Sequence, residues 1–366
     1  MKEFKVYCPY CNNEYNKNEL LFQCSCGKPL SIAYSFDQNS SFITNKKINS
    51  IWRYIFLLPV DIDITNAVSF GEGFTPLLRE VYKDKTCFIK LESINPSGSF
   101  KDRGASILIS YLKSIGVKEF IEDSSGNAGL AYAMYAARAN LTAHIYVPHY
   151  LNENRLFHLN LLNAKVHVIS GTRKDVSDAA LIASEKIYYA SHAWNPFFLH
   201  GVKTIVYEIC EQFNSDSLPP IYISTGNGTL LLGIFLGLKD LFNLKLINKI
   251  PPLFAIQPAN CAPLKYFKEH RSLEGFTPGY SVAEGTLIGN PPRLTEMINA
   301  IEETKGDIIA ISDESILNAF RMLNSKGYFV EPTSSLAFAA FMEKPLDNGI
   351  VILTGSALKI NKSDKY

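Results

Sequence analysis

The chain has 366 residues, of which 47% are hydrophobic and 19% are charged, and its 36 basic and 35 acidic side chains give a formal net charge of +1. The high apolar content excludes an intrinsically disordered chain, and the balanced charge excludes a dominant surface for polyanions. The longest apolar stretch, 230–238, is far shorter than the ~20 residues of a membrane span, and the N-terminus has no signal-peptide core. We expect a cytoplasmic, globular protein that binds neither membranes nor nucleic acid.

Four of the seven cysteines gather near the N-terminus. Cys8 and Cys11 form a C-x2-C pair, and Cys24 and Cys26 follow as C-x-C after twelve residues. Four thiolates on two tight turns can close a tetrahedral shell around zinc. Two unrelated pairs of reduced thiols are the alternative, and the odd total argues against a disulfide framework. We predict a small structural zinc ribbon over residues 1–35.

Short β-branched runs alternate with longer amphipathic stretches from residue 87 onward, after a polar connector and a short helix at 51–58. The predicted strands are 87–91, 120–123, 143–147, 165–169, 221–224, 253–257, 308–311, 328–330 and 350–353. The predicted helices of the first half are 102–114, 128–140, 154–163 and 174–187, and helical patterns separate the later strands. Apolar strands in such an alternation are typical of parallel sheets with helices on both faces. We predict an α/β fold of two open, mainly parallel-sheet lobes plus the ribbon.

One lysine stands where a polar loop enters a predicted helix, in the sequence Asn-Pro-Ser-Gly-Ser-Phe-Lys-Asp-Arg-Gly of residues 95–104. The helix N-terminus and Arg103 place positive potential at Lys101, which favours the neutral amine that forms Schiff bases. A lone lysine is more often a solvated surface residue. The surrounding pattern is what makes Lys101 a candidate.

Three further polar segments follow predicted strands. Ser124-Ser125-Gly126-Asn127 offers hydroxyls, an amide and helix-terminal N–H groups for a carboxylate, or else a helix cap. The loop at 224–229 places small residues before a helix, where backbone N–H groups can hold an anion, although a plain turn explains it equally well. Thr354 lies where α/β sheets bind ligands. No G-x-G-x-x-G, P-loop, G-x-S-x-G or H-E-x-x-H motif occurs.

These segments, in this order, resemble the pyridoxal-phosphate enzymes of the fold type II (tryptophan synthase β) group, and within it the threonine synthases. The resemblance covers nearly the whole chain. Besides the ribbon and the four segments, its motifs are Gly71–Leu77, Lys90–Glu92, Asn195-Pro196, Gly201 with Lys203-Thr204, Ile288–Pro291 and Phe329–Pro332.

The resemblance implies a role for each matching residue. Lys101 would form the Schiff base with pyridoxal 5'-phosphate, and Asn127 would hydrogen-bond the phenolic oxygen of the cofactor. Thr354 would face its pyridine nitrogen, and Ser124 and Ser125 would hold the substrate carboxylate. The cofactor phosphate would be held by the loop formed by Gly226, Asn227, Gly228 and Thr229.

The resemblance further implies a domain division and an activity. Residues 36–95 and 198–366 would form the large cofactor-binding domain, and 96–197 the small substrate-binding domain. The expected reaction converts O-phospho-L-homoserine and water to L-threonine and phosphate, with a phosphorylated amino acid as the small-molecule partner. A homodimer is one assembly that the sequence leaves open.

Three departures from the family pattern bear on the substrate: His200 before Gly201, Ser356-Ala357 after Gly355, and Ala283-Glu284-Gly285, which is more typical of dehydratase relatives. The alternatives are therefore a serine/threonine dehydratase, a β-replacement enzyme of the cysteate or cysteine synthase type, or a catalytically silent binding protein. The groups that hold the substrate phosphate stay open among Ser97, Arg103, Arg155 and Lys203.

Overall fold

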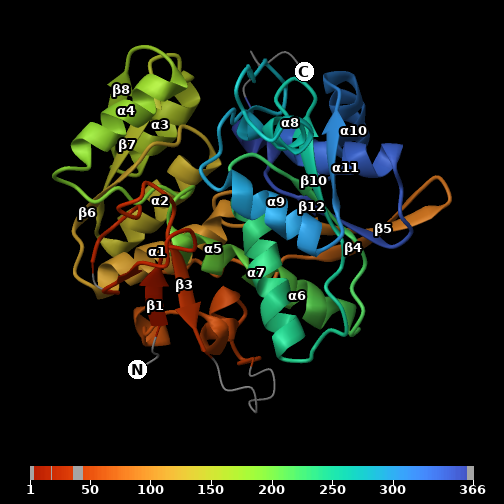
Figure 1. The fold of residues 1–366 in the computed structure, drawn as a ribbon, viewed down its shortest axis with the longest axis horizontal. Coiled ribbons are helices and arrows are strands. Elements are labelled where there is room, and N and C mark those ends of the chain that lie inside the picture. The colour runs from red at the N-terminus through yellow and green to blue at the C-terminus, as the bar shows by residue number, and fades with distance from the viewer. Residues whose placement is uncertain (1–3, 18, 36–43, 361–366) are drawn as a thin grey trace. The chain divides into compact units, whose positions relative to one another are not determined.

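The computed structural model describes residues 4–17, 19–35 and 44–360, and the chain divides into two compact units (Figure 1). The first unit comprises Met1–Glu72 and Lys101–Val202, and the second comprises Gly73–Phe100 and Lys203–Tyr366. Each unit contains a sheet made mainly of parallel strands. The α/β fold of two mainly parallel lobes that the sequence predicts is confirmed.

The N-terminal ribbon is a small antiparallel sheet in the order β2-β1-β3, made of β1 (Phe4–Tyr7), β2 (Glu14–Tyr15) and β3 (Ser31–Tyr34). Aromatic contacts anchor it to the rest of the first unit. The Phe4 ring meets Phe197 edge to face with 5.6 Å between centroids. Such pairs stabilise a contact beyond the area they bury. The ribbon is therefore packed against the rest of the first unit and is not merely connected to it through the chain.

The main sheet of the first unit has three parallel strands in the order β6-β7-β8: β6 (Glu119–Glu122), β7 (Thr142–Pro148) and β8 (Lys165–Ile169). Helix α2 (Asn127–Ala139) packs on β7, and α4 (Arg173–Ala183) packs on all three strands. The remaining helices of the unit are α1 (Lys101–Ser114), α3 (Glu153–Leu161) and α5 (Pro196–Val202), with 3-10 turns η1 (Ile51–Leu57) and η2 (Ile64–Asn66).

Helices α1 and α5 approach each other closely because each contributes a glycine to the contact. A methyl group on Gly104 would overlap the ring of Phe198, and one on Gly201 would overlap the backbone carbonyl of Arg103. Interiors packed this densely leave no room for an added atom. The two glycines therefore set the position of α1, whose first residue is Lys101.

The second unit is built on a six-stranded sheet in the order β11-β10-β9-β12-β5-β4. Its strands are β4 (Leu77–Tyr82), β5 (Lys85–Leu91), β9 (Ile221–Ser224), β10 (Leu253–Pro258), β11 (Asp307–Ile311) and β12 (Gly349–Leu353). All neighbours are parallel except the β4–β5 hairpin. Its helices are α6 (Thr204–Phe213), α7 (Thr229–Asn243), α8 (Pro263–His270), α9 (Leu294–Glu303), α10 (Asp313–Ser325) and α11 (Pro332–Glu343). Three 3-10 turns complete it: η3 (Glu92–Ile94), η4 (Glu284–Thr286) and η5 (Ala357–Lys359).

Apolar side chains cover both faces of this sheet. Alternate residues such as Tyr222, Ile256 and Val351 form one buried cluster with Phe338 and Phe341 of α11. The intervening strand residues are also buried, and α7 and α9 pack on the central strands. Every residue of β9 and β12 is buried. This is why those strands read as continuous apolar runs in the sequence.

The predicted elements match the structure to within a few residues at their ends, with one error. Residues 328–330 do not form a strand: Val330 makes an isolated bridge to Ser356, and Phe329 has a φ of +50° that an extended strand does not allow. One strand was missed. Leu77–Tyr82 lies at the sheet edge with partly exposed side chains, so it lacks the apolar run of a buried strand.

A buried ion pair joins β5 to α6 in the second unit. Lys90 Nζ lies 2.8 Å from Glu208 Oε2, and both side chains are fully buried. The ammonium also donates to the Thr75 carbonyl at 2.7 Å and to Gln212 Oε1 at 3.0 Å. Its three protons thus have acceptors, as a buried charge requires.

Replacing Lys90 with Met should lower the free energy of unfolding of the second unit by about 3–5 kcal/mol, because the Glu208 charge would stay buried without its partner. Lys268→Met is a matched control, since its pair with Asp307 at 3.1 Å is about half exposed on both sides, and it should cost less than about 1 kcal/mol. Urea unfolding followed by circular dichroism measures both. Equal losses in the two variants would contradict this account.

Candidate functional site

Lys101 is the first residue of α1 and sits on an aromatic ring. Its ammonium nitrogen lies 5.5 Å from the centroid of the Phe198 ring. Burial lowers the pKa of Lys101 to about 8, and the Glu122 carboxylate acts in the opposite direction. The direction agrees with the sequence-based expectation, but the cause is burial rather than Arg103. About half of the amine is therefore neutral, and hence nucleophilic, at about pH 8.

Ser124, Ser125 and Asn127 lie together at the carboxyl end of β6, where the chain enters α2. The N–H of Gly126 donates to Ser124 Oγ at 3.3 Å. The N-cap position of α2 is Gly126, and no side chain caps the helix there. A methyl group on Gly129 would overlap the Ser124 carbonyl, so the loop folds tightly against the first turn of the helix. This helix N-terminus suits a carboxylate.

The glycine-rich loop at residues 226–228 connects β9 to α7 in the second unit. A Cβ on Gly226 would lie 2.9 Å from the Cα of Thr286, and Gly228 has a φ of +86°. Only glycine fits both positions without strain. No side chain caps the N-terminus of α7, which begins at Thr229. Backbone N–H groups and the helix dipole thus converge there, an arrangement that favours a phosphate.

Thr354 follows β12, which lies beside β9 in the sheet. Parallel strands end at the same edge, so Thr354 and the glycine-rich loop share the carboxyl edge of the second unit's sheet. Thr354 Oγ1 lies 3.0 Å from Ser334 Oγ, and Ser334 also accepts from the N–H of Gly355 at 2.6 Å. No sequence pattern indicates a role for Ser334, because it is a single serine inside the apolar helix α11. The carbonyl of Thr354 accepts from the N–H of Phe100, the residue before Lys101, at 3.0 Å.

Two groups bear on the open question of the substrate phosphate. Lys203 forms a buried ion pair with Asp240 at 2.9 Å, so its charge is already balanced within the second unit. Arg103 is fully buried in α1. Glu122 and His192 form a buried pair that was not predicted from the sequence, although an acidic residue at the end of an apolar strand is a signal for such a pair.

The four N-terminal cysteines come together in the ribbon. Their sulfur atoms all lie within 4.8 Å of one another, and two pairs, Cys8–Cys26 and Cys11–Cys24, are 3.6 and 3.4 Å apart. Zn–S bonds of 2.3 Å in a tetrahedron require sulfur–sulfur distances of about 3.8 Å. The Tyr15 hydroxyl lies 2.9 Å from Cys24 Sγ and can orient that ligand. This cluster could therefore hold a metal ion.

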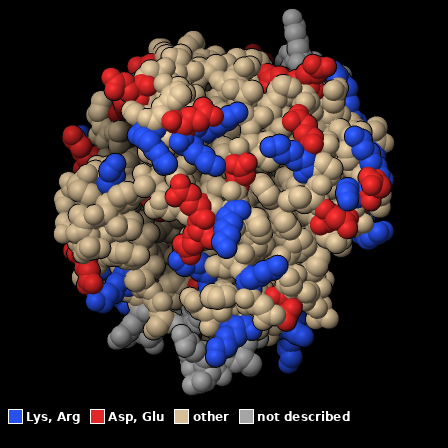
Figure 2. Space-filling model, turned by 45° about the vertical axis from the view of Figure 1, so that its right-hand side comes forward, with Lys and Arg blue, Asp and Glu red and all other residues tan. Residues whose placement is uncertain are grey.

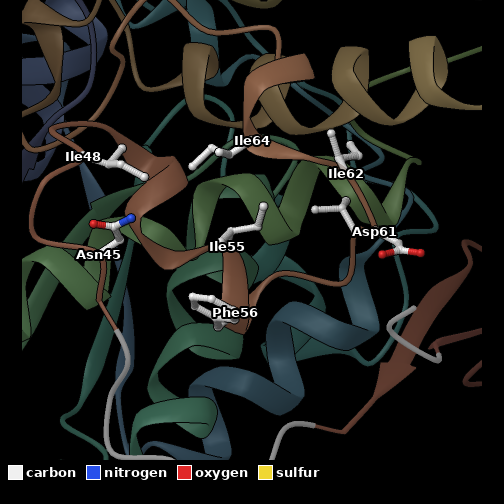
Figure 3. A pocket seen from close by; sticks show the side chains of 8 residues that line it. Asn45, Ile48, Ile55, Phe56, Asp61, Ile62 and Ile64 are labelled. Carbon is white, nitrogen blue, oxygen red and sulfur yellow. The ribbon is translucent and has the colours of Figure 1, made fainter.

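A separate pocket of about 310 Å³ lies in the first unit, away from these residues in the sequence. Isoleucines dominate its wall (Figure 3), which is formed by Asn45, Ile48, Ile55, Phe56, Val60, Asp61, Ile62 and Ile64.

Basic and acidic side chains are interspersed on the face that Figure 2 draws. Within the described ranges, no helix combines the length and hydropathy that a membrane crossing requires.

Comparison with known proteins identifies the family of this chain. The pattern of the family described as "Pyridoxal-phosphate dependent enzyme" matches residues 68–355. This chain belongs to that family. A threonine synthase of Methanocaldococcus jannaschii is 31% identical over 96% of this chain and 92% of the relative, and one of Methanosarcina acetivorans is 31% identical over 97% and 92%. The protein is thus a threonine synthase-like member of the pyridoxal-phosphate dependent enzymes.

Two solved structures show that proteins with other names share the fold. A maize serine racemase matches with a TM-score of 0.65 and 20% identity over 78% of this chain and 89% of that chain. The processed form of threonine deaminase isoform 2 from Solanum lycopersicum matches with a TM-score of 0.65 and 21% identity over 77% and 79%. Membership implies pyridoxal phosphate as cofactor. The residues fit that group: Lys101 offers a partly buried amine with a lowered pKa, and the loop before α7 leaves space that only glycine permits.

Replacing Cys24 with Ser should remove the zinc ion that we expect in each chain, because a hydroxyl is a poor substitute for a thiolate ligand. Part of the stability should be lost, while the folded fraction keeps its turnover, since four protein ligands leave no open coordination site. Cys210→Ser, on α6, is the control and should retain the metal. Elemental analysis by mass spectrometry measures the content. Metal-free wild-type protein, after preparation without chelators, would contradict the zinc assignment.

Proposed function

We propose that the protein is a threonine synthase that converts O-phospho-L-homoserine and water to L-threonine and phosphate. The observation that carries the proposal is the partly buried Lys101 with its lowered pKa, at the start of α1, in a chain that aligns with threonine synthases over nearly its full length. A zinc ion in the cysteine cluster would have a purely structural role.

Each candidate residue has a place in this proposal. Lys101 would hold the cofactor, Asn127 would bind its phenolic oxygen, and Thr354 would face the pyridine nitrogen. The loop before α7 would hold the cofactor phosphate with Gly226, Asn227, Gly228 and Thr229. The β6–α2 loop would bind the substrate carboxylate with Ser124 and Ser125.

The bound cofactor would supply an electron sink that makes carbon–hydrogen bonds of the substrate acidic. Lys101 would remove one proton from Cα and one from Cβ as general base, and would return protons as general acid. Phosphate would leave Cγ with the bonding electron pair, one proton would be added to Cγ and one to Cα, and the hydroxyl of water would be added to Cβ in place of the proton removed there. A hydroxyl at Thr354, unlike a carboxylate, does not enforce a protonated pyridine ring.

Borohydride reduction of the purified yellow protein should fix the cofactor covalently to Lys101. Lys101→Ala should lose the visible absorbance and lower turnover by at least about 10³-fold, because it removes both the attachment point and the proton-transfer group. Lys113→Ala, an exposed lysine in the same helix, should behave as wild type. Peptide mass spectrometry identifies the labelled residue, and a label on any other lysine would overturn the assignment.

Incubation with O-phosphohomoserine in deuterated water should yield threonine and phosphate in equal amounts. Deuterium should appear at Cα and in the methyl group, because both carbons receive their protons after exchange with solvent. Separate incubations with serine, threonine, and O-phosphoserine plus sulfite or sulfide are the controls. An oxoacid from serine or threonine with O-phosphohomoserine inert would replace the proposal by a dehydratase. Turnover only of O-phosphoserine with the sulfur nucleophile would replace it by a β-replacement enzyme.

A further inference from the structure

A buried acid–base pair lies in the first unit at the carboxyl end of β6. Glu122, the last residue of that strand, accepts from the ring Nδ1–H of His192 at 2.7 Å and from the His192 backbone N–H at 3.0 Å. The Glu122 side chain is fully buried, and that of His192 is 8% exposed. The ring and the backbone of His192 therefore each donate a hydrogen bond to one oxygen of the Glu122 carboxylate, which fixes the plane of the carboxylate.

The segment that carries His192 is itself attached to β6. The backbone of Ile121 donates to the Tyr188 carbonyl and accepts from the N–H of Ala190, both at 2.8 Å. The hydroxyl of Tyr132, on α2, donates to the Ala190 carbonyl at 3.0 Å. The distance between Glu122 and His192 is thus set by strand-like pairing and does not depend on the pair itself.

One aromatic ring connects this pair to Lys101. Phe198 meets the His192 ring edge to face at 5.7 Å between centroids, and the Lys101 ammonium lies 5.5 Å from the centroid of the same ring. The charges also interact directly. The Glu122 carboxylate raises the pKa of Lys101, and Lys101 in turn lowers that of Glu122. The buried Phe198 ring therefore contacts both Lys101 and the imidazole that holds the Glu122 carboxylate.

We propose that Glu122, held by His192, is a positioning residue whose buried carboxylate serves as a counter-charge for the ammonium form of Lys101. The proposal rests on the proposed function for the role of Lys101. It adds a buried carboxylate that acts on the amine through space, without touching the substrate.

Several charged and titratable groups around the pair shift the pKa values of Glu122 and His192. Burial raises the pKa of Glu122 to about 7, while the His192 N–H, Lys101 and Arg173 lower it. Burial, Lys101 and Arg173 lower the pKa of His192, and Asp123 raises it. The imidazole is therefore neutral and donates from Nδ1. Tyr132 and Tyr189 also face Glu122, and their pKa values are raised, so both stay protonated. As pH rises past about 7, Glu122 becomes the negative partner of Lys101.

The test is the titration of Lys101 in the full-length chain from which the cofactor has been removed. Pulse acetylation at a series of pH values, read on the Lys101 peptide by mass spectrometry, gives the midpoint of amine deprotonation. Glu122→Gln keeps a hydrogen-bond acceptor but loses the charge, so the midpoint should fall by about 1 pH unit. Glu119→Gln is the matched control, because its carboxylate lies on the same strand but contacts His144 instead, and it should leave the midpoint unchanged.

A second variant keeps the proposal testable if Glu122→Gln does not fold. His192→Leu leaves the Glu122 carboxylate without its partner, which favours the protonated acid, so the Lys101 midpoint should fall again, by less. In the cofactor-loaded enzyme, Glu122→Gln should move the acid limb of kcat to lower pH and leave KM unchanged, whereas a purely structural role lowers kcat at every pH. An unchanged midpoint in both folded variants would overturn the inference.

The two proposals fail separately. Borohydride labelling of Lys101 together with an unshifted midpoint would refute the role of Glu122 and leave the function intact. A shifted midpoint with the cofactor attached to another lysine would refute the function and leave the electrostatic coupling intact.

Discussion

The close contact of α1 with α5 is the constraint on which the first unit depends. Gly104 admits the ring of Phe198, and Gly201 admits the backbone of α1 at Arg103. The same α5 residues face other parts of the unit: Phe197 stacks on Tyr111 at 3.8 Å between centroids and meets the ribbon at Phe4. A side chain at either glycine would push α1 away and move Lys101 off its ring. The position of the candidate catalytic amine is therefore a packing property of the core.

Partial burial of the Lys101 ammonium has a free-energy cost that two neighbouring groups offset. Desolvation of an ammonium is unfavourable, and it lowers the pKa until the neutral form is accessible. The Phe198 ring offers its negative face to the charged form, and Glu122 offers a carboxylate. At the loop before α7, the second unit offers an anion backbone N–H groups instead of a charged side chain, so no buried charge has to be desolvated there. These carry partial charges and need no counter-ion when the anion is absent.

Two departures from the family pattern have structural explanations within their own units. The His200 ring packs edge to face on Tyr34 of the ribbon sheet at 5.3 Å between centroids. Ser356 accepts from the N–H of Leu358 at the start of η5, and its own N–H donates to the Gly98 carbonyl at 2.9 Å. Each residue thus has a packing or hydrogen-bonding role within its own unit. Their presence here does not by itself require a different reaction.

The sequence by itself determined the order of elements, the parallel sheets, the cysteine cluster and the loops that carry the candidate residues, because these follow from local patterns of apolar, small and metal-ligating residues. It did not reveal the edge strand at 77–82, the absence of a strand at 328–330, or the partners Ser334, Glu122 and His192. Those depend on which side chains meet after folding, between segments as distant as β6 and residue 192. The lowered pKa of Lys101 was expected from its helix position, but its main cause, burial, exists only in the packed core.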